Sequence, residues 1–227
     1  MATQLAQTVE PRQSDATKFE AGRAGEIERL ETQLVIGEPV WAIAQLFPGQ
    51  GQWSEEEYLA LDTNHFVEFS HGCLEVLEMP TESHQDFALL LYELLRQFVK
   101  PRNSGKILLA PFRIQLWPGK YREPDVIFML AENSRRRSEH YWIGADLVME
   151  IISPNDRNRD VVTKRHEYAQ AGIPEYWLID PQSKTITVFA LQGTLYTVHG
   201  EFGLGAQATS RLLAGFTVDV ALIFAAQ

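Results

Sequence analysis

Cysteine and long apolar runs are nearly absent from this sequence, and each absence excludes a class of protein. Cys73 is the only cysteine among 227 residues, so the chain cannot form an internal disulfide, and we expect it to work in a reducing, cytoplasmic environment. No stretch of about 18 apolar residues occurs, and residues 1–15 lack the basic-then-apolar order of a signal peptide. We therefore expect no membrane span and no export.

Positive charge is also scarce. The chain has 20 lysines and arginines against 30 acidic residues, a net charge of −10, which argues against strong sequence-independent binding to nucleic acid, because such binding depends on cations that neutralise phosphates. The deficit is concentrated in residues 1–62, where eleven acids face four bases, while residues 63–227 have nineteen against sixteen. Within that second part, three neighbouring arginines form a candidate phosphate-facing rim, although solvated loops explain them equally well: Arg157, Arg159 and Arg165.

The composition changes near residue 48. Residues 1–48 are polar and end in the turn-forming sequence FPGQGQ, which predicts an N-terminal arm, partly helical near 21–34 or disordered. Residues 49–227 are long enough and apolar enough to form one folded domain. The chain contains no internal repeat and no low-complexity tract.

Periodic apolar patterns in the folded domain predict a mixture of strands and helices. Ser54 can cap a first helix, and Ser83 with Asp86 resembles a capping box for a long amphipathic helix. Residues 121–128 alternate as one strand with an irregular position at Pro124, and Gly172 closes a later helix. The predicted elements are a hairpin over 65–79, a helix over 81–100, strands within 106–130, a strand over 145–153 that is apolar on both faces, a helix over 159–171, strands over 175–180, 185–191 and 195–200, and a strand or short helix within 211–224.

Three charged residues occupy positions that the patterns predict to be buried. Glu150 interrupts the apolar strand ADLVMEIIS, where an ionised carboxylate is costly unless a positive group meets it. Asp125 follows a proline on a strand, and Lys164 lies on the helix face that packs on the sheet, although lysines are seldom buried unpaired. Asp160 offers the simplest partner for Lys164 through an i,i+4 ion pair. Together the residues would bring two carboxylates and an ammonium to one end of a sheet, which predicts a hard divalent cation there.

The segment from residue 124 to 180 resembles a known family. EPD, MEIISP, the spacing of Asp160, Lys164 and Tyr168, AGIPEYW and ID are similar, in this order, to the motifs of the Uma-type restriction endonuclease family, a cyanobacterial domain of unknown function in the PD-(D/E)XK nuclease superfamily. The likeness extends over residues 53–227. It implies an α/β (α+β) fold of the restriction-endonuclease-like type, with a mixed central sheet flanked by helices and extra β-hairpins. It also implies Mg²⁺-dependent hydrolysis of phosphodiester bonds in double-stranded DNA, with Mn²⁺ as a substitute.

The resemblance assigns roles to individual residues. Asp125 and Glu150 match the two acidic metal ligands, and the main-chain carbonyl of Ile151 is the expected third ligand. The superfamily's lysine usually stands two residues after the second acid, but Ile152 occupies that position. Lys164, on the following helix, resembles the displaced lysine of this family and completes the expected catalytic set.

Four further residues are candidates for supporting roles in this site: His84, Asp160, Tyr168 and Asp180. Each also has a simpler structural interpretation. His84 stands near a helix start, Tyr168 lies on a packing face, and Asp180 ends a strand where a turn follows. Trp177 and Cys73 are best explained as core residues.

Two other functions remain open at the level of sequence. One is a catalytically silent nucleic-acid-binding or scaffold module on the same fold, which the acidic charge and the displaced lysine favour. The other is a metal-dependent hydrolase of smaller phosphate esters. Because cleavage of two strands by a single-site nuclease commonly needs two copies, we also expect a homodimer, with the apolar segment 216–224 as a candidate contact.

Overall fold

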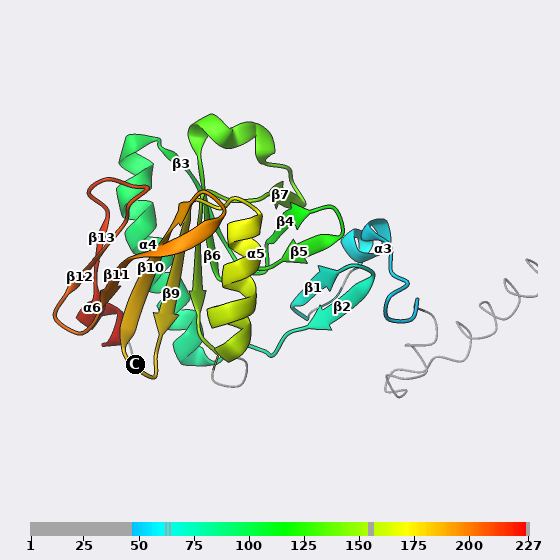
Figure 1. Cartoon of the computed structure of the whole chain (residues 1–227), viewed down its shortest axis with the longest axis horizontal. Coiled ribbons are helices and arrows are strands. Elements are labelled where there is room, and N and C mark those ends of the chain that lie inside the picture. The colour runs from blue at the N-terminus through cyan, green and yellow to red at the C-terminus, as the bar shows by residue number, and fades with distance from the viewer. Residues whose placement is uncertain (1–46, 62, 64, 154–156, 226–227) are drawn as a thin grey trace, which may run out of the picture. The chain divides into compact units, whose positions relative to one another are not determined.

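The computed structural model describes residues 47–61, 63, 65–153 and 157–225 (Figure 1). The chain divides into two compact units, residues 1–49 and 50–227, and the fold described below is that of the second unit. The helix predicted near 21–34 lies outside the described residues.

A six-stranded mixed sheet forms the centre of this unit. Its spatial order is β11-β10-β9-β8-β6-β3, with β8 and β9 parallel and the other neighbours antiparallel. Every residue of β8 is buried, which explains why that strand is apolar on both faces. The strands are β3 (Gly105–Leu109), β6 (Val126–Leu130), β8 (Leu147–Ile151), β9 (Glu175–Asp180), β10 (Thr185–Gln192) and β11 (Leu195–Phe202).

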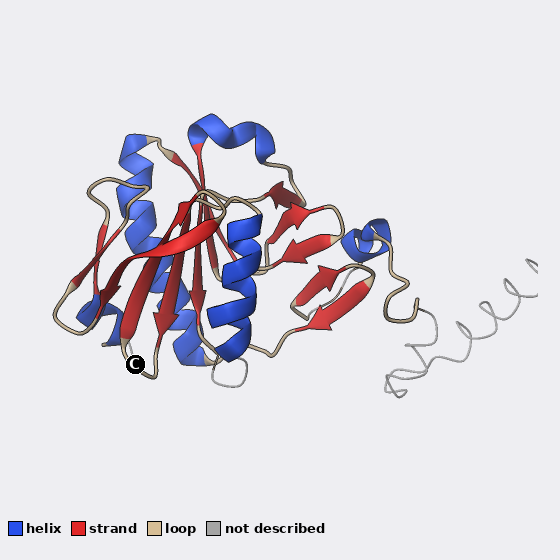
Figure 2. Ribbon diagram, in the orientation of Figure 1, coloured by secondary structure: helices blue, strands red, loops and turns tan. Residues whose placement is uncertain are grey.

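Helices cover both faces of the sheet (Figures 1 and 2). On one face, α4 (Glu82–Val99) packs through a buried stripe that includes Leu91 and Leu95. The same core takes in β12 (Gln207–Thr209), β13 (Thr217–Asp219) and α6 (Val220–Phe224). On the other face, a π-helical segment (Arg159–Lys164) continues into α5 (Arg165–Gln170), and Gly172, with a φ of +75°, follows its end. This arrangement confirms the fold class predicted from the sequence.

A second, five-stranded sheet has the order β2-β1-β5-β4-β7. Its strands are β1 (Val67–Ser70), β2 (Cys73–Val76), β4 (Arg113–Trp117), β5 (Lys120–Arg122) and β7 (Tyr141–Ile143). Helix α3 (Glu55–Ala60) packs on it through Tyr58, which stacks on Phe69. Ser54 caps α3 in a full capping box with Glu57, as predicted for Ser54. Short 3₁₀ helices follow α4 and β6, over Lys100–Arg102 and Ala131–Arg136.

Two local predictions were wrong. Helix α4 is capped by Thr81 rather than Ser83, because Thr81 has the extended backbone of a cap and its hydroxyl accepts the N–H of His84. Residues 121–128 do not form one strand, since Pro124 has no N–H to donate to a sheet. The chain instead leaves the smaller sheet after Arg122 and enters the larger sheet at Val126.

The C-terminal segment 216–224 contains β13 and α6. Its packing contradicts the prediction that its apolar residues contact a second chain. Phe216, Val218, Val220 and Ile223 are all at most 3% exposed and belong to the core beneath α4. They are therefore not available to a second chain. No helix in the described part of the chain is long and apolar enough to cross a membrane.

The buried stripe of α4 should carry much of its contribution to stability. Leu91 is 0% exposed, whereas Leu89, on the same helix, is 48% exposed. We expect Leu91→Ala to lower the free energy of unfolding by about 2–5 kcal/mol and Leu89→Ala to change it by less than about 0.5 kcal/mol. Urea unfolding of both variants measures the difference, and equal losses would show that α4 does not pack as described.

Candidate active site

A cavity of about 990 Å³ opens where β8 ends, beside the start of α4. Of the eleven residues that the sequence predicts for the site, seven line this cavity: His84, Asp125, Glu150, Ile151, Arg159, Asp160 and Lys164. They come from the first turn of α4, the residue before β6, the end of β8 and the π-helical segment. Residues far apart in the chain thus meet where strands of the larger sheet begin and end.

The two acids predicted as metal ligands come from neighbouring strands. Glu150 is the last residue but one of β8 and is 2% exposed. Asp125 directly precedes β6, which pairs with β8 so that Val126 lies opposite Met149. The Asp125 carboxylate accepts the backbone N–H of Ile151 at 2.7 Å. This hydrogen bond fixes Asp125 against the end of β8, next to Glu150.

Lys164 reaches both acids that flank it. Its Nζ lies 3.0 Å from Oε2 of Glu150 and 3.0 Å from Oδ1 of Asp160, so the predicted i,i+4 ion pair is present together with a second partner. The side chain is buried on the sheet-facing side of the helix. The segment that carries it is π-helical, a local geometry that occurs frequently at functional sites.

Two of the supporting candidates contact the acids directly. His84 Nε2 lies 3.3 Å from Oδ2 of Asp125, and the Tyr168 hydroxyl donates a hydrogen bond to Oε1 of Glu150 at 2.5 Å. Tyr168 is fully buried behind the cavity wall. Asp180 does not line the cavity, since its carboxylate pairs with Arg157 and accepts the N–H groups of the turn that follows β9.

Negative charge outweighs positive charge in this site. Burial raises the pKa of Glu150 well above its usual range, and Lys164 offsets this only in part because Asp125 and Asp160 add to it. Burial likewise raises the pKa of Asp160 against the pull of Lys164. For Lys164, burial would lower the pKa, but Glu150, Glu68 and Asp160 raise it. The ammonium therefore stays charged, and the carboxylates retain a demand for further positive charge.

The donor atoms of the site suit a hard divalent cation. Asp125 and Glu150 present carboxylate oxygens, the ligands that Mg²⁺ prefers. In the described part of the chain, no three histidine, cysteine or acidic side chains are grouped so that they could hold a metal ion by themselves. A cation here would therefore need two carboxylates completed by a main-chain carbonyl and water, which matches the usual Mg²⁺ site with few protein ligands.

The three arginines predicted as a phosphate rim each contact a partner within the fold. Arg159 lines the cavity, but its guanidinium is bound to Glu68 and Glu75. Arg157 is paired with Asp180, and the guanidinium of Arg165 lies over the ring of Phe189, 5.5 Å from its centroid. Of the three arginines, only Arg159 lines the cavity, and the phosphate rim stays a prediction.

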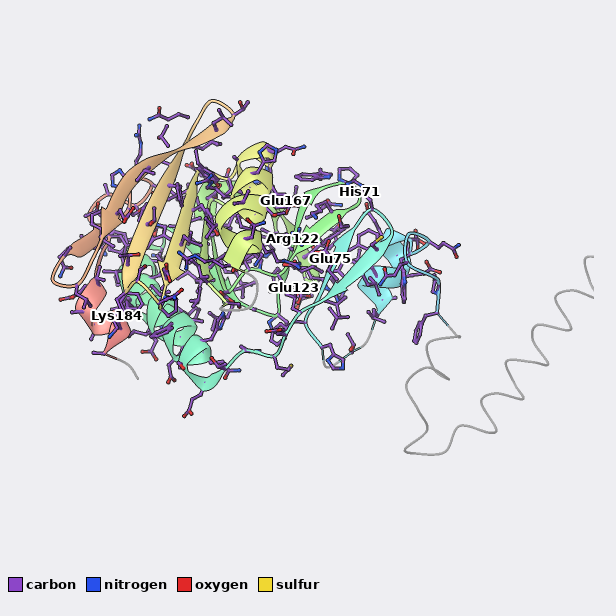
Figure 3. The ribbon with its side chains drawn as sticks, turned by 60° about the horizontal axis from the view of Figure 1, so that its bottom comes forward. His71, Glu75, Arg122, Glu123, Glu167 and Lys184 are labelled. Carbon is purple, nitrogen blue, oxygen red and sulfur yellow. The ribbon has the colours of Figure 1, made fainter. Side chains whose placement is uncertain are left out.

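Sequence reasoning missed a buried ion network that joins the smaller sheet to the helix of Lys164 (Figure 3). Arg122 is 2% exposed and donates to Glu68, to Glu75 at 2.7 Å and to Glu167 at 2.8 and 3.0 Å. Arg159 contacts Glu68 and Glu75 as well. The network therefore fixes the π-helical segment and α5 against β1 and β2.

A signal for this network was present in the sequence. Glu68 interrupts an apolar strand between Val67 and Phe69, as Glu150 does in β8, and it is 0% exposed. A four-residue strand is too short for that interruption to stand out against an ordinary alternating pattern. Glu123, which also lines the cavity, lies in the connection between β5 and β6 and not within the predicted strand 121–128, and sequence reasoning assigned it no role.

Comparison with known proteins adds to this geometry. The Uma2 family model, described as "Putative restriction endonuclease", matches residues 55–221, a range that contains every residue of the candidate site. The fold is similar to a crystal structure of "a putative nuclease belonging to DUF820" from Anabaena variabilis, with a TM-score of 0.64 and 20% identity over 79% of this chain and 99% of that one. At that identity the likeness shows a shared fold alone. No curated protein matches the chain.

The network predicts a pH dependence of stability. Burial would raise the pKa of Glu68, but Lys164, Arg122 and Arg159 lower it to about 2. A depressed folded-state pKa contributes stability that is complete above the unfolded value, near 4.5, and is lost as the pH falls toward 2. We expect Glu68→Gln to lower the free energy of unfolding by about 3 kcal/mol at pH 7.

The difference between Glu68→Gln and the unaltered chain should shrink as the pH falls from 5 to 3, and urea unfolding at several pH values measures it. Glu93→Gln, on the exposed side of α4, is the matched control and should unfold like the unaltered chain at pH 7. A difference that stays constant over this pH range would mean that Glu68 is not held ionised by the network.

Proposed function

Since the chain belongs to the Uma2 family, we propose that it is a metal-dependent endonuclease that hydrolyses phosphodiester bonds in DNA. The observation that carries this proposal is the convergence of Asp125, Glu150 and Lys164 in one cavity, from two strands and a helix. Double-stranded DNA is the substrate that the family likeness implies. A reducing cytoplasm is the environment that the lone cysteine favours.

Asp125 and Glu150, with the main-chain carbonyl of Ile151, would hold Mg²⁺, and Mn²⁺ would substitute for it. A divalent ion in such a site supplies a water of lowered pKa and stabilises charge that develops on a phosphate oxygen. Other side chains of the protein hold the two carboxylates in place. His84 contacts Asp125, and Tyr168 donates a hydrogen bond to Glu150, so each acid has a partner that fixes its orientation.

Lys164 would act on the phosphate rather than on the ion. Its ammonium, kept charged by Glu150 and Asp160, is positioned to share the negative charge that builds up during phosphodiester hydrolysis. Asp160 also anchors Lys164 from the preceding turn of the same helix. An ammonium held by two carboxylates is confined to one place, so little reorganisation is needed when the charge develops.

The burial of the site argues against a catalytically silent module. Glu150 and Lys164 are 2% and 6% exposed, and the desolvation of two such charges is costly even when they are paired. Apolar residues of similar size would stabilise the same fold at least as well. A scaffold without activity would have no use for this arrangement, whereas a nuclease needs it.

We also propose that the chain acts as a homodimer, because one catalytic site cuts one strand at a time. Light scattering should give a mass about twice that of one chain in the absence of DNA. Since the apolar segment 216–224 is buried in the chain's own core, Leu222→Ser, an exposed position in it, should leave that mass unchanged. A mass equal to one chain would remove the proposal of a stable dimer without touching the candidate active site.

The proposed activity predicts nicking of supercoiled plasmid in the presence of Mg²⁺ or Mn²⁺ and none in a chelator. Glu150→Gln and Asp125→Asn should each lower the nicking rate by about 100-fold or more, because each removes a ligand charge, and Lys164→Gln should lower it by about 100-fold through the loss of charge stabilisation. Gel analysis of nicked and linear plasmid over time measures these rates.

Glu93→Gln is the control for purification and for the loss of one glutamate, and it should nick like the unaltered chain. If Glu150→Gln nicked plasmid as fast as the unaltered chain, the activity would come from a contaminant and the proposal would fall. Circular dichroism of each variant separates loss of chemistry from loss of fold.

A further inference from the structure

The candidate active site occupies only part of its cavity. At about 990 Å³, the space is at the upper end of the range for small-molecule pockets, which runs from about 300 to 1,000 Å³. The acids and Lys164 form one side, where the strands of the larger sheet end. The segment that leaves β2 and leads into α4 forms another, and its lining residues are mainly apolar: Val76, Leu77, Met79 and Pro80, with Phe66 next to them from the other arm of the hairpin.

This apolar wall is unusually exposed. Ten large hydrophobic side chains are exposed in the described part of the chain, and three of them line this one cavity. They are Val76 at 66%, Met79 at 64% and Leu89 at 48%. Exposed apolar side chains gathered at a concave site, rather than scattered singly, mark a surface that binds an apolar group.

The charges of the cavity show which ligand chemistry it disfavours. Among the described residues, Lys164, Arg159 and, when protonated, His84 are the cations that line it, and each is paired: Lys164 with Glu150, Arg159 with Glu68, and His84 with Asp125. Glu78 and Asp86 add further carboxylates to its lining. A DNA backbone laid along this cavity would bring its phosphates close to carboxylates and to cations that already have acidic partners. The cavity is therefore poorly suited to binding several phosphates at once.

We propose that the apolar wall receives a nucleobase of the nucleotide whose phosphate is cleaved, so that this nucleotide leaves the base stack to enter the cavity. The inference rests on the proposed function and names its substrate class, DNA with unpaired nucleotides at the point of cleavage. Contact of an extruded base with apolar side chains is tolerant of sequence and needs no cation. A perfect duplex is cut only after a nucleotide has been extruded, which costs unstacking energy that a single strand or a mismatch avoids.

Cleavage of matched oligonucleotides tests this proposal. With Mn²⁺, a labelled single strand should be cleaved with a kcat/KM at least tenfold above that of the same strand in a perfect duplex, and a single mismatch should restore part of the difference. Val76→Ser combined with Met79→Ser should lower kcat/KM on the single strand about tenfold. Leu222→Ser, at an apolar position on α6 that is 48% exposed and lies outside the cavity, is the control and should have no effect.

Binding in the presence of a chelator tests the contact between bases and the apolar wall, here called the base pocket, without any cleavage. Anisotropy should show the intact chain binding oligothymidylate at least tenfold more tightly than an abasic strand of the same length, which carries the same phosphates and no bases. The Val76→Ser, Met79→Ser double variant should lose this preference. Both positions are exposed, so thermal unfolding should confirm that the variant is folded.

The two proposals fail in different ways. Equal binding of the thymidylate and abasic strands, or faster cleavage of the perfect duplex than of the single strand, would overturn the base pocket while leaving the nuclease intact. Absence of cleavage on every substrate, with the preference for bases retained and lost again in the double variant, would support the pocket and overturn the nuclease.

Discussion

The ion pair between Lys164 and Glu150 is the interaction on which the rest of this structure depends. Both groups are almost fully buried, and neither would be tolerated there alone. Their meeting requires that β8 hold its register and that the following helix pack on the same face of the sheet. Glu150 shares that face with Val148 and Ile152, which belong to the core beneath α5, while Met149 and Ile151 face α4. A shift of one residue in β8 would turn Glu150 toward α4 and leave Lys164 without its partner.

The path of the chain through Pro124 connects the smaller sheet directly to the candidate site in the larger sheet. Arg122, the last residue of β5, is the centre of the network that fixes the helix of Lys164. Asp125, three residues later, stands at the entrance to the larger sheet and holds the end of β8 through Ile151. The same short connection therefore positions one candidate ligand directly and the lysine through its helix. This gives a structural reason for a proline at a point where a continuous strand would have kept both residues in one sheet.

The parts of the site that the sequence predicted are those that break a local pattern. Glu150 and Lys164 are charged residues in apolar positions, and such positions have few explanations, so their burial and their convergence were foreseeable. Arg159 was foreseeable as a cation but not as the partner of Glu68, because nothing in a linear sequence says that the hairpin 67–76 meets the helix 90 residues later. Thr81 and Ser83 have equivalent capping chemistry, and only the packing of α4 decides between them. The apolar segment 216–224 was read as a contact surface because its partners in the core come from elements too distant in sequence to recognise.

The acidity of this chain, which first argued against nucleic acid, is consistent with the structure once the location of each charge is known. The cations near the candidate site have partners within the fold, so they stabilise the arrangement of the site instead of attracting a polyanion from a distance. A nuclease built in this way would gain little affinity from counterion release. In the proposed function it would instead draw binding energy from bases that an unpaired strand exposes, through the exposed apolar side chains beside the carboxylates. Discrimination would then depend on how readily a nucleotide leaves its stack, and the sequence around that nucleotide would matter only through the cost of extruding it.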